Sequence, residues 1–168
     1  MSIGHLRIPG EVTRREYAVY IAVAHNRVTG NTRLYVGKTG DNREGCNPII
    51  SRLGNHFSFN KVHSQLRNHL SPPLDAYDYD VFYITFGGYR DPKESRCLID
   101  LTNEMERRAN TLAQEMFGKD LLINPHQGIG YVSRAERESR SAMVTAEHKQ
   151  QLDALIARVR QFLDKMGH

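Results

Sequence analysis

Residues 17–57 read YAVYIAVAHNRVTGNTRLYVGKTGDNREGCNPIISRLGNHF, and this stretch decides the fold. Over residues 17–24, Tyr17 and larger aliphatic side chains alternate with Ala18, Tyr20 and further alanines. A period of two predicts a β-strand whose two faces carry different side chains. Tyr20 then lies on the face with the small side chains, where we expect its hydroxyl to be approachable.

A second run of the same kind follows. Leu34 and Val36 share one face of a predicted strand, while Tyr35 and Gly37 share the other. The intervening residues, HNRVTGN, are typical of a hairpin loop. If this hairpin forms, Tyr35 can face the same way as Tyr20.

The next predicted element is a helix that carries Arg52 and His56. The two residues are four apart, so they are neighbours on one helix surface. Ile49, Leu53 and Phe57 form an adjacent apolar stripe. We therefore expect two phenols, a guanidinium and an imidazole to converge on one polar face of a small sheet.

Three segments in this order carry a resemblance: Ala18-Val19-Tyr20, Tyr35-Val36-Gly37 and Arg52-Leu53-Gly54-Asn55-His56. They resemble the GIY, YIG and R-x-x-x-H motifs of the GIY-YIG nuclease superfamily. The resemblance implies an α+β fold in which helices flank a small, mainly antiparallel three-stranded sheet. It also implies an endonuclease that hydrolyses phosphodiester bonds of double-stranded DNA with Mg²⁺ or Mn²⁺.

Further elements can be predicted along the chain. Residues 60–70 read as a helix, and residues 80–86 as a third strand. Asp91 is the predicted N-cap of a long helix that runs to Phe117, with Gly118 as its terminator. The expected core stripe of this helix comprises Leu98, Leu101, Met105, Leu112 and Met116.

The long helix must supply the carboxylate that a metal-dependent nuclease needs, since Mg²⁺ prefers a few carboxylate oxygens together with water. Glu104 has Arg108 at i+4 and is expected to form a surface ion pair. Glu106 lies beside the core stripe, in line with small side chains, and has no cation at i+4. We choose Glu106 as the metal ligand and keep Glu104 as the alternative.

The resemblance implies roles for the other site residues. Tyr20 would accept the proton of the attacking water, assisted by Lys38 or Tyr35. Because an unperturbed phenol has a pKa near 10, nearby positive charge would have to lower the pKa of Tyr20. Arg52 would hold the non-bridging oxygens of the phosphate, and His56 would orient water, phosphate or Tyr20. The resemblance also implies a catalytic role for Asn124, which matches the family's asparagine after the long helix.

Composition is compatible with this function but does not establish it. The 168 residues carry a formal charge of +4. We divide the chain into an N-terminal arm (1–16), the nuclease-like domain (17–130) and a basic connector with a C-terminal helix (131–168). The two cysteines lack metal-ligand spacing, and no run of apolar residues reaches membrane-spanning length. We expect a cytoplasmic protein without a membrane partner.

Basic side chains outside the motifs are candidate DNA ligands. They are Lys61, Arg67, Arg134, Arg137 and Arg140. The stretch 40–48 is a candidate recognition loop. The helix expected at 145–166 has an apolar stripe that packs on its own domain or in the interface of a homodimer or higher oligomer.

A different class of protein fits the same residues. A non-catalytic nucleic-acid-binding module, or a protein-interaction module, could have this scaffold and tolerate the loss of Tyr20 or Glu106. Among nucleases, the compact chain favours a restriction-like or mobile-element-encoded enzyme over a homing enzyme with an added DNA-binding domain.

Overall fold

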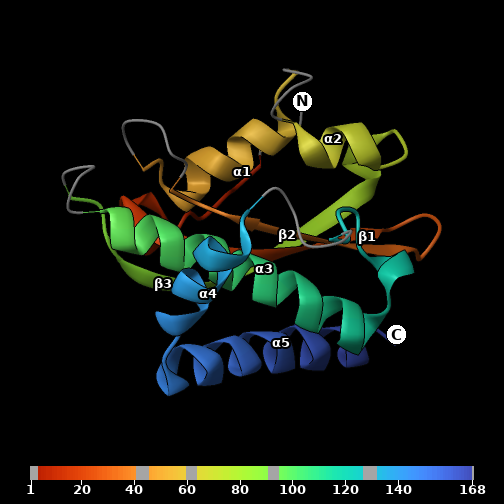
Figure 1. Ribbon diagram of the computed structural model, residues 1–168. Helices are drawn as coiled ribbons and strands as arrows, with labels where there is room; N and C mark the ends of the chain where they lie inside the picture. The colour runs from red at the N-terminus through yellow and green to blue at the C-terminus, as the bar shows by residue number, and fades with distance from the viewer. Residues whose placement is uncertain (1–3, 41–45, 60–63, 91–94, 127–131, 168) are drawn as a thin grey trace.

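The computed structural model describes residues 4–40, 46–59, 64–90, 95–126 and 132–167. Within these ranges the chain has an α+β fold, in which a three-stranded antiparallel sheet is flanked by five α-helices (Figure 1). The coarse fold predicted from the sequence is thus confirmed.

The sheet has the strand order β2-β1-β3. The central strand β1 (Glu16–Asn26) pairs antiparallel with β2 (Thr32–Lys38) on one side and with β3 (Tyr77–Gly88) on the other. The predicted hairpin joins β1 to β2. The third strand is longer than predicted because its pairing with β1 continues to the end of that strand.

Helices cover both faces of the sheet (Figure 1). Helices α1 (Ile49–Phe57) and α2 (Gln65–His69) lie on one face, whereas α3 (Arg96–Phe117) and α5 (Ala146–Met166) lie on the other. The alternation read from the sequence separates two cores. On the α3 side the buried strand residues are Val19, Ile21, Val23, Leu34 and Val36. On the α1 side they are Tyr20, Ala22, Ala24, Tyr35 and Tyr77.

Two predicted helices begin later in the structure. Helix α2 spans only Gln65–His69, and the beginning of the predicted helix, 60–63, lies outside the described residues. Helix α3 begins at Arg96 after Ser95, and the predicted cap at Asp91 also lies outside them. The predicted end is confirmed, since Gly118 follows α3 with a φ of 83°.

The core stripe of α3 differs in part from the prediction. Leu101 and Met105 are buried as expected, but Met116 is 46 % exposed. The buried face also includes polar residues, notably Glu104 and Asn110, which an apolar period does not reveal.

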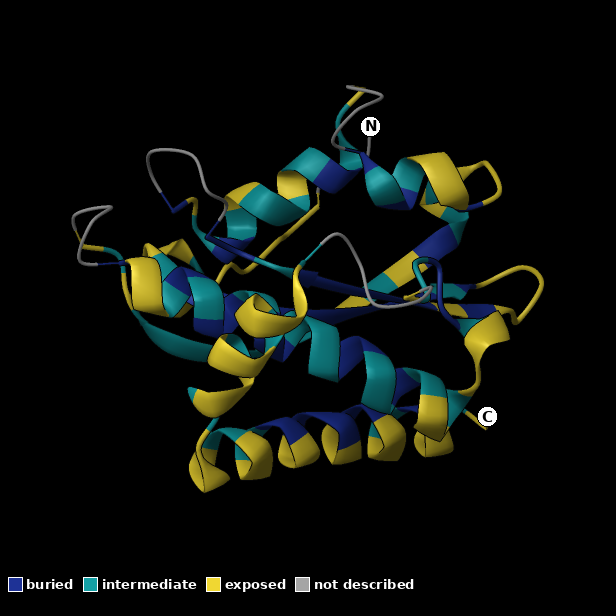
Figure 2. Cartoon of the chain, in the orientation of Figure 1, coloured by how far each residue is buried: buried dark blue, intermediate teal, exposed yellow. Residues whose placement is uncertain are grey.

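The predicted connector contains a helix, α4 (Arg134–Ala142). The side chain of Ser133 accepts a hydrogen bond from the backbone N–H of Glu136 and so caps its first turn. No residue of α4 is buried. Polar contacts hold it on α3, among them an ion pair of 3.0 Å between Arg140 and Asp100. Figure 2 shows how much of its surface is exposed.

The C-terminal helix α5 is largely as predicted. Thr145 caps it, and the helix ends before Gly167. Its apolar side lies in the same core as the sheet and α3, with Leu152, Leu155 and Val159 among the buried residues. No helix among the described residues has the length and apolar character needed to cross a membrane.

Candidate functional site

The site begins with a buried contact between β1 and α1. The hydroxyl of Tyr20 lies 2.6 Å from Nε2 of His56, and both side chains are 0 % exposed. The face that carries Tyr20 was predicted to leave its hydroxyl approachable. Instead, the helices α1 and α2 cover that face. The sequence could not show this, because it does not place α2 relative to β1.

The second tyrosine completes an aromatic cluster. The ring of Tyr35 meets that of His56 edge to face, with ring centroids 4.7 Å apart. The ring centroids of Tyr20 and Tyr35 are 6.2 Å apart. Gly37 makes this packing possible. A Cβ at that position would lie 2.5 Å from the hydroxyl oxygen of Tyr20 and 2.7 Å from the ring of Tyr35. Only glycine therefore fits beside the two phenols without displacing them.

Burial dominates the protonation of this pair. It raises the pKa of Tyr20 well above 10, and the neighbouring Tyr35 adds to the rise. Arg52 acts in the opposite direction through its charge and a hydrogen bond, but its effect is smaller. Burial, followed by the charge of Arg52, lowers the pKa of His56 to about 4. The pair is therefore neutral at pH 7, and the expected lowering of the Tyr20 pKa does not occur in the protein alone.

Glu106 lies on α3 at the margin of β2. Its carboxylate Oε2 is 3.4 Å from Nζ of Lys38, and the side chains are 28 % and 19 % exposed. Lys38 also donates a hydrogen bond to Asn103 on the same helix. Burial raises the pKa of Glu106, whereas Lys38 lowers it most among the neighbouring groups.

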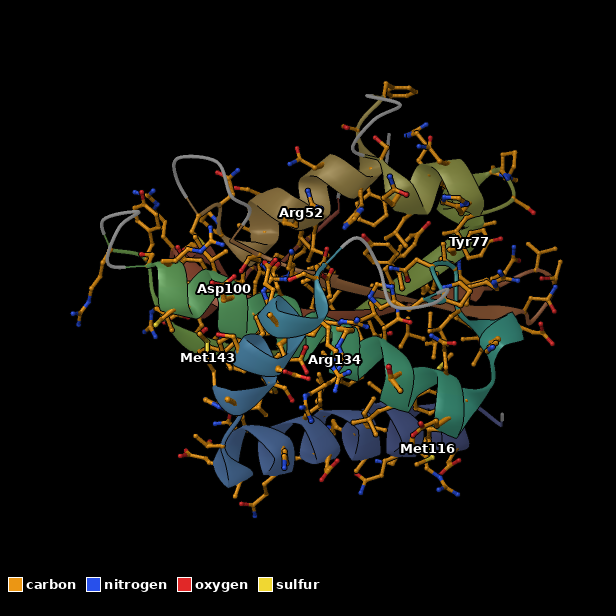
Figure 3. All side chains as sticks on the ribbon, viewed as in Figure 1. Arg52, Tyr77, Asp100, Met116, Arg134 and Met143 are labelled. Atoms are coloured by element: carbon orange, nitrogen blue, oxygen red, sulfur yellow. The ribbon has the colours of Figure 1, made fainter. Side chains whose placement is uncertain are left out.

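Weaker electrostatic effects link Glu106 to the rest of the cluster. Its pKa is also lowered by His126 and Arg52, and the charge of Glu106 raises the pKa of Tyr20. The predicted residues Tyr20, Arg52 and Glu106 therefore come from β1, α1 and α3 to one region. Figure 3 shows Arg52 on the α1 side of the sheet and Asp100, on α3, on the other side. His126 also belongs to this region, and no periodic pattern in the sequence indicates it.

Glu104 has a different environment. It was expected to lie on the outer side of α3, yet its side chain is only 2 % exposed. It accepts hydrogen bonds from Arg107 at 2.7 and 2.9 Å and from Arg108 at 2.8 Å. These arginines outweigh the effect of burial and lower the pKa of Glu104. Its carboxylate oxygens are thus occupied by guanidinium groups, which leaves Glu106 as the carboxylate of the cluster.

Asn124 holds the backbone of β2. Its side-chain oxygen accepts from the N–H of Val36 at 3.1 Å, and its amide donates to the carbonyl of Val36 at 2.7 Å. Val36 lies between Tyr35 and Gly37. Asn124 is a predicted catalytic residue, and in the structure both polar atoms of its side chain bind the backbone of β2.

A second asparagine ties this segment to α3. Asn110, which is 2 % exposed, donates to the carbonyl of Asn124 and accepts from the N–H of His126, both at 2.8 Å. It lies one turn after Glu106 on the same helix. Two asparagines thus connect the helix of the carboxylate to the strand of Tyr35. The sequence could have indicated Asn110, because it is a polar residue on the inner side of a predicted helix.

The basic residues predicted to bind DNA make contacts within the chain wherever the structure describes them. Arg67 donates to the carbonyl of Phe57 at 2.9 Å and lies 3.9 Å from the ring centroid of Phe59. Lys61 lies outside the described residues. On α4, Arg134 pairs with Glu138 at 2.8 Å.

The other two arginines of α4 are less exposed. Arg140 pairs with Asp100 at 3.0 Å and Glu136 at 2.6 Å. Nε of Arg137 is buried. Arg140 therefore fixes α4 on α3 and does not extend toward solvent.

A divalent ion would find one protein carboxylate here. Among the described residues, no three His, Cys, Asp or Glu side chains are grouped so that they could hold a metal ion. Mg²⁺ commonly keeps several waters and takes only one or two carboxylates together with substrate phosphate. Glu106 is partly exposed and fits that pattern, with Lys38 supplying positive charge beside it.

Comparison with protein-family models, curated proteins and solved structures found no match for this chain.

Proposed function

We propose that this protein is a Mg²⁺- or Mn²⁺-dependent DNA endonuclease of the GIY-YIG type. The observation that carries the proposal is the approach of Tyr20, Arg52 and Glu106 to one another from three separate elements. Phosphodiester hydrolysis needs a proton acceptor, a cation for the charged transition state and a metal ligand. These three side chains supply those functions.

In this proposal Arg52 binds the non-bridging oxygens of the scissile phosphate. Its guanidinium suits the geometry of a phosphate better than a point charge does. Glu106 would hold the divalent ion, which would supply positive charge at the phosphate. Lys38 lies beside Glu106 and provides a second cation for the phosphate or the attacking water.

Tyr20 takes the proton of the attacking water, and His56 positions its hydroxyl. The raised pKa of Tyr20 opposes this role in the protein alone. Arg52 favours the phenolate, and a bound cation would act in the same direction, since nearby positive charge lowers the pKa of a phenol. His56 is neutral at pH 7 and can donate to the phenolate oxygen through Nε2 or accept from the phenol, according to its tautomer.

The direct test is cleavage of supercoiled plasmid by the purified protein. We expect nicked and linear products in Mg²⁺ or Mn²⁺, and none in EDTA. Arg52→Ala should remove cleavage in Mg²⁺, whereas Arg158→Ala, an exposed change on α5, should leave it unchanged. Equal cleavage by the two variants, or cleavage that persists in EDTA, would contradict the proposal.

The alternative is a non-catalytic nucleic-acid-binding module on the same scaffold. The specific observation that favours it is the closure of the cluster, in which Tyr20 is fully buried and Lys38 neutralises Glu106. In that case the protein binds DNA with the same affinity in Mg²⁺ and EDTA and leaves the plasmid intact.

A further inference from the structure

A cavity of about 290 Å³ adjoins the candidate site along α3. Its lining residues are Arg107, Thr111, Gln114, Glu115, Lys119 and His126. His126 links the two places, because it lines this cavity and its charge also acts on Glu106. The cavity thus begins where the site ends and continues toward the C-terminal end of α3.

The charge of this cavity is positive. Glu104 is one buried carboxylate shared by Arg107, which lines the cavity, and Arg108, which does not, so the trio has one positive charge in excess. The side chain of Arg107 is 43 % exposed, and it lines the cavity. Lys119 adds a second cation against the single carboxylate of Glu115.

The wall beside the site is held firmly. Oδ1 of Asn110 accepts a hydrogen bond from the backbone N–H of His126 at 2.8 Å. The same oxygen accepts a second hydrogen bond from the side chain of Gln114 at 2.6 Å. His126 is therefore presented by a hydrogen-bonded segment, and its imidazole can donate to an anion. Thr111 and Gln114 add neutral polar side chains to the lining.

We propose that this cavity binds backbone phosphate of the DNA strand that passes through the candidate site, with Lys119, His126 and Arg107 as its ligands. The inference rests on the proposed function and adds the path of the substrate to it. From Glu106 to Gln114 the helix rises about 12 Å, at 1.5 Å per residue. A DNA strand advances about 3.4 Å per nucleotide along its axis, so the cavity receives phosphates about three to four nucleotides from the cleaved bond.

The test compares two lysines in equivalent positions. Lys119 follows the end of α3, and Lys165 lies in the last turn of α5. Lys119→Glu and Lys165→Glu change the net charge equally and alter similar interactions with a helix C-terminus. Each variant is titrated into a fluorescein-labelled DNA duplex in EDTA, and anisotropy is measured at several salt concentrations.

We expect Lys119→Glu to lower affinity about tenfold at 0.1 M salt and to reduce the salt slope by about one phosphate contact. His126→Ala should weaken binding in the same direction by a smaller factor. Lys165→Glu should remain within about twofold of the wild type, because Lys165 does not line the cavity. Unchanged melting temperatures would show that the variants are folded.

Other outcomes separate this inference from the proposed function. If the wild type cleaves plasmid but Lys119→Glu binds like Lys165→Glu, the phosphate cavity is overturned and the nuclease stands. If Lys119→Glu alone weakens binding and no plasmid is cleaved, the cavity is supported and the nuclease is not. A wild type that neither binds nor cleaves DNA overturns both.

Discussion

Tyr20 and His56 form a neutral, buried pair whose chemistry depends on its surroundings. The hydrogen bond of 2.6 Å between the Tyr20 hydroxyl and Nε2 of His56 fixes the orientation of the phenol. Burial keeps both groups uncharged, so any phenolate must form when positive charge is brought to the site. The sequence motifs predicted that Tyr20 and His56 belong to the site. They did not predict how deeply the two side chains are buried, because that depends on the packing of α1 and α2.

Removal of the Tyr20 hydroxyl tests its chemical role. Tyr20→Phe should lower the rate of plasmid cleavage by about 10² to 10⁴, the range for loss of a general base, at a cost of about 1 kcal/mol in stability. Tyr79→Phe is the matched control, because it removes a hydroxyl that donates to the carbonyl of Leu74. Equal rates for the two variants would exclude Tyr20 as the base.

The buried imidazole predicts how stability depends on pH. The folded-state pKa of His56 is about 4, below its ordinary value of 6.5, so the unfolded chain takes up the proton first. Stability should therefore fall as the pH is lowered from 6.5 to 4, by about 3 kcal/mol from this residue. Urea unfolding at pH 7 and pH 4.5 measures the loss of unfolding free energy between the two pH values. This loss should be smaller for His56→Gln than for the wild type. An identical loss in both proteins would contradict this assignment.

At the scale of elements, a pair of asparagines joins helix to strand. Asn110 connects α3 to the segment of Asn124, and Asn124 binds both backbone groups of Val36 in β2. Because β2 is an edge strand, Asn124 satisfies backbone groups that face away from β1. The relative position of Glu106 and Tyr35 depends on this connection.

Substitutions at Asn124 should affect stability in steps. Asn124→Ala removes both hydrogen bonds to Val36 and should cost about 2–3 kcal/mol. Asn124→Asp keeps the acceptor for the N–H but loses the donor to the carbonyl, so it should cost less. Urea unfolding measures both changes. A loss below about 0.5 kcal/mol for Asn124→Ala would show that the contact is dispensable.

The elements with clear periodicity were predictable, and the others were not. The strands β1 and β2, the helix α1 and the end of α3 follow from alternation, spacing and Gly118. Helix α4 was missed because its contacts are polar, and a helix without an apolar stripe has no hydrophobic period. Since α4 was missed, its contacts with α3 were missed too, including the hydrogen bond of 2.6 Å from Arg108 to Ser141.

At the scale of the whole molecule, the two cores on opposite faces of the sheet differ in the residues they contain. The core on the α3 side contains the aliphatic residues and α5, whereas that on the α1 side contains the tyrosines of the site. The sequence predicted the faces of the strands. It could not predict which helices cover which face, because amphipathic stripes do not identify their partners. The predicted homodimer or higher oligomer stays a prediction.

The role of α5 in the core can be measured directly. Leu155 is 5 % exposed, so Leu155→Ala should destabilise the protein by about 2–5 kcal/mol in urea unfolding. Arg158→Ala, an exposed change on the same helix, should stay within about 0.5 kcal/mol of the wild type. A Leu155→Ala protein as stable as the wild type would mean that α5 does not support the sheet.

The most direct test of the central claim is the effect of Glu106→Ala on cleavage and DNA binding in the same preparation. We predict that plasmid cleavage in Mg²⁺ is abolished while duplex affinity in EDTA is largely retained, because Glu106 is assigned to the metal and not to the DNA. Cleavage by the variant at a rate near that of the wild type would contradict the account.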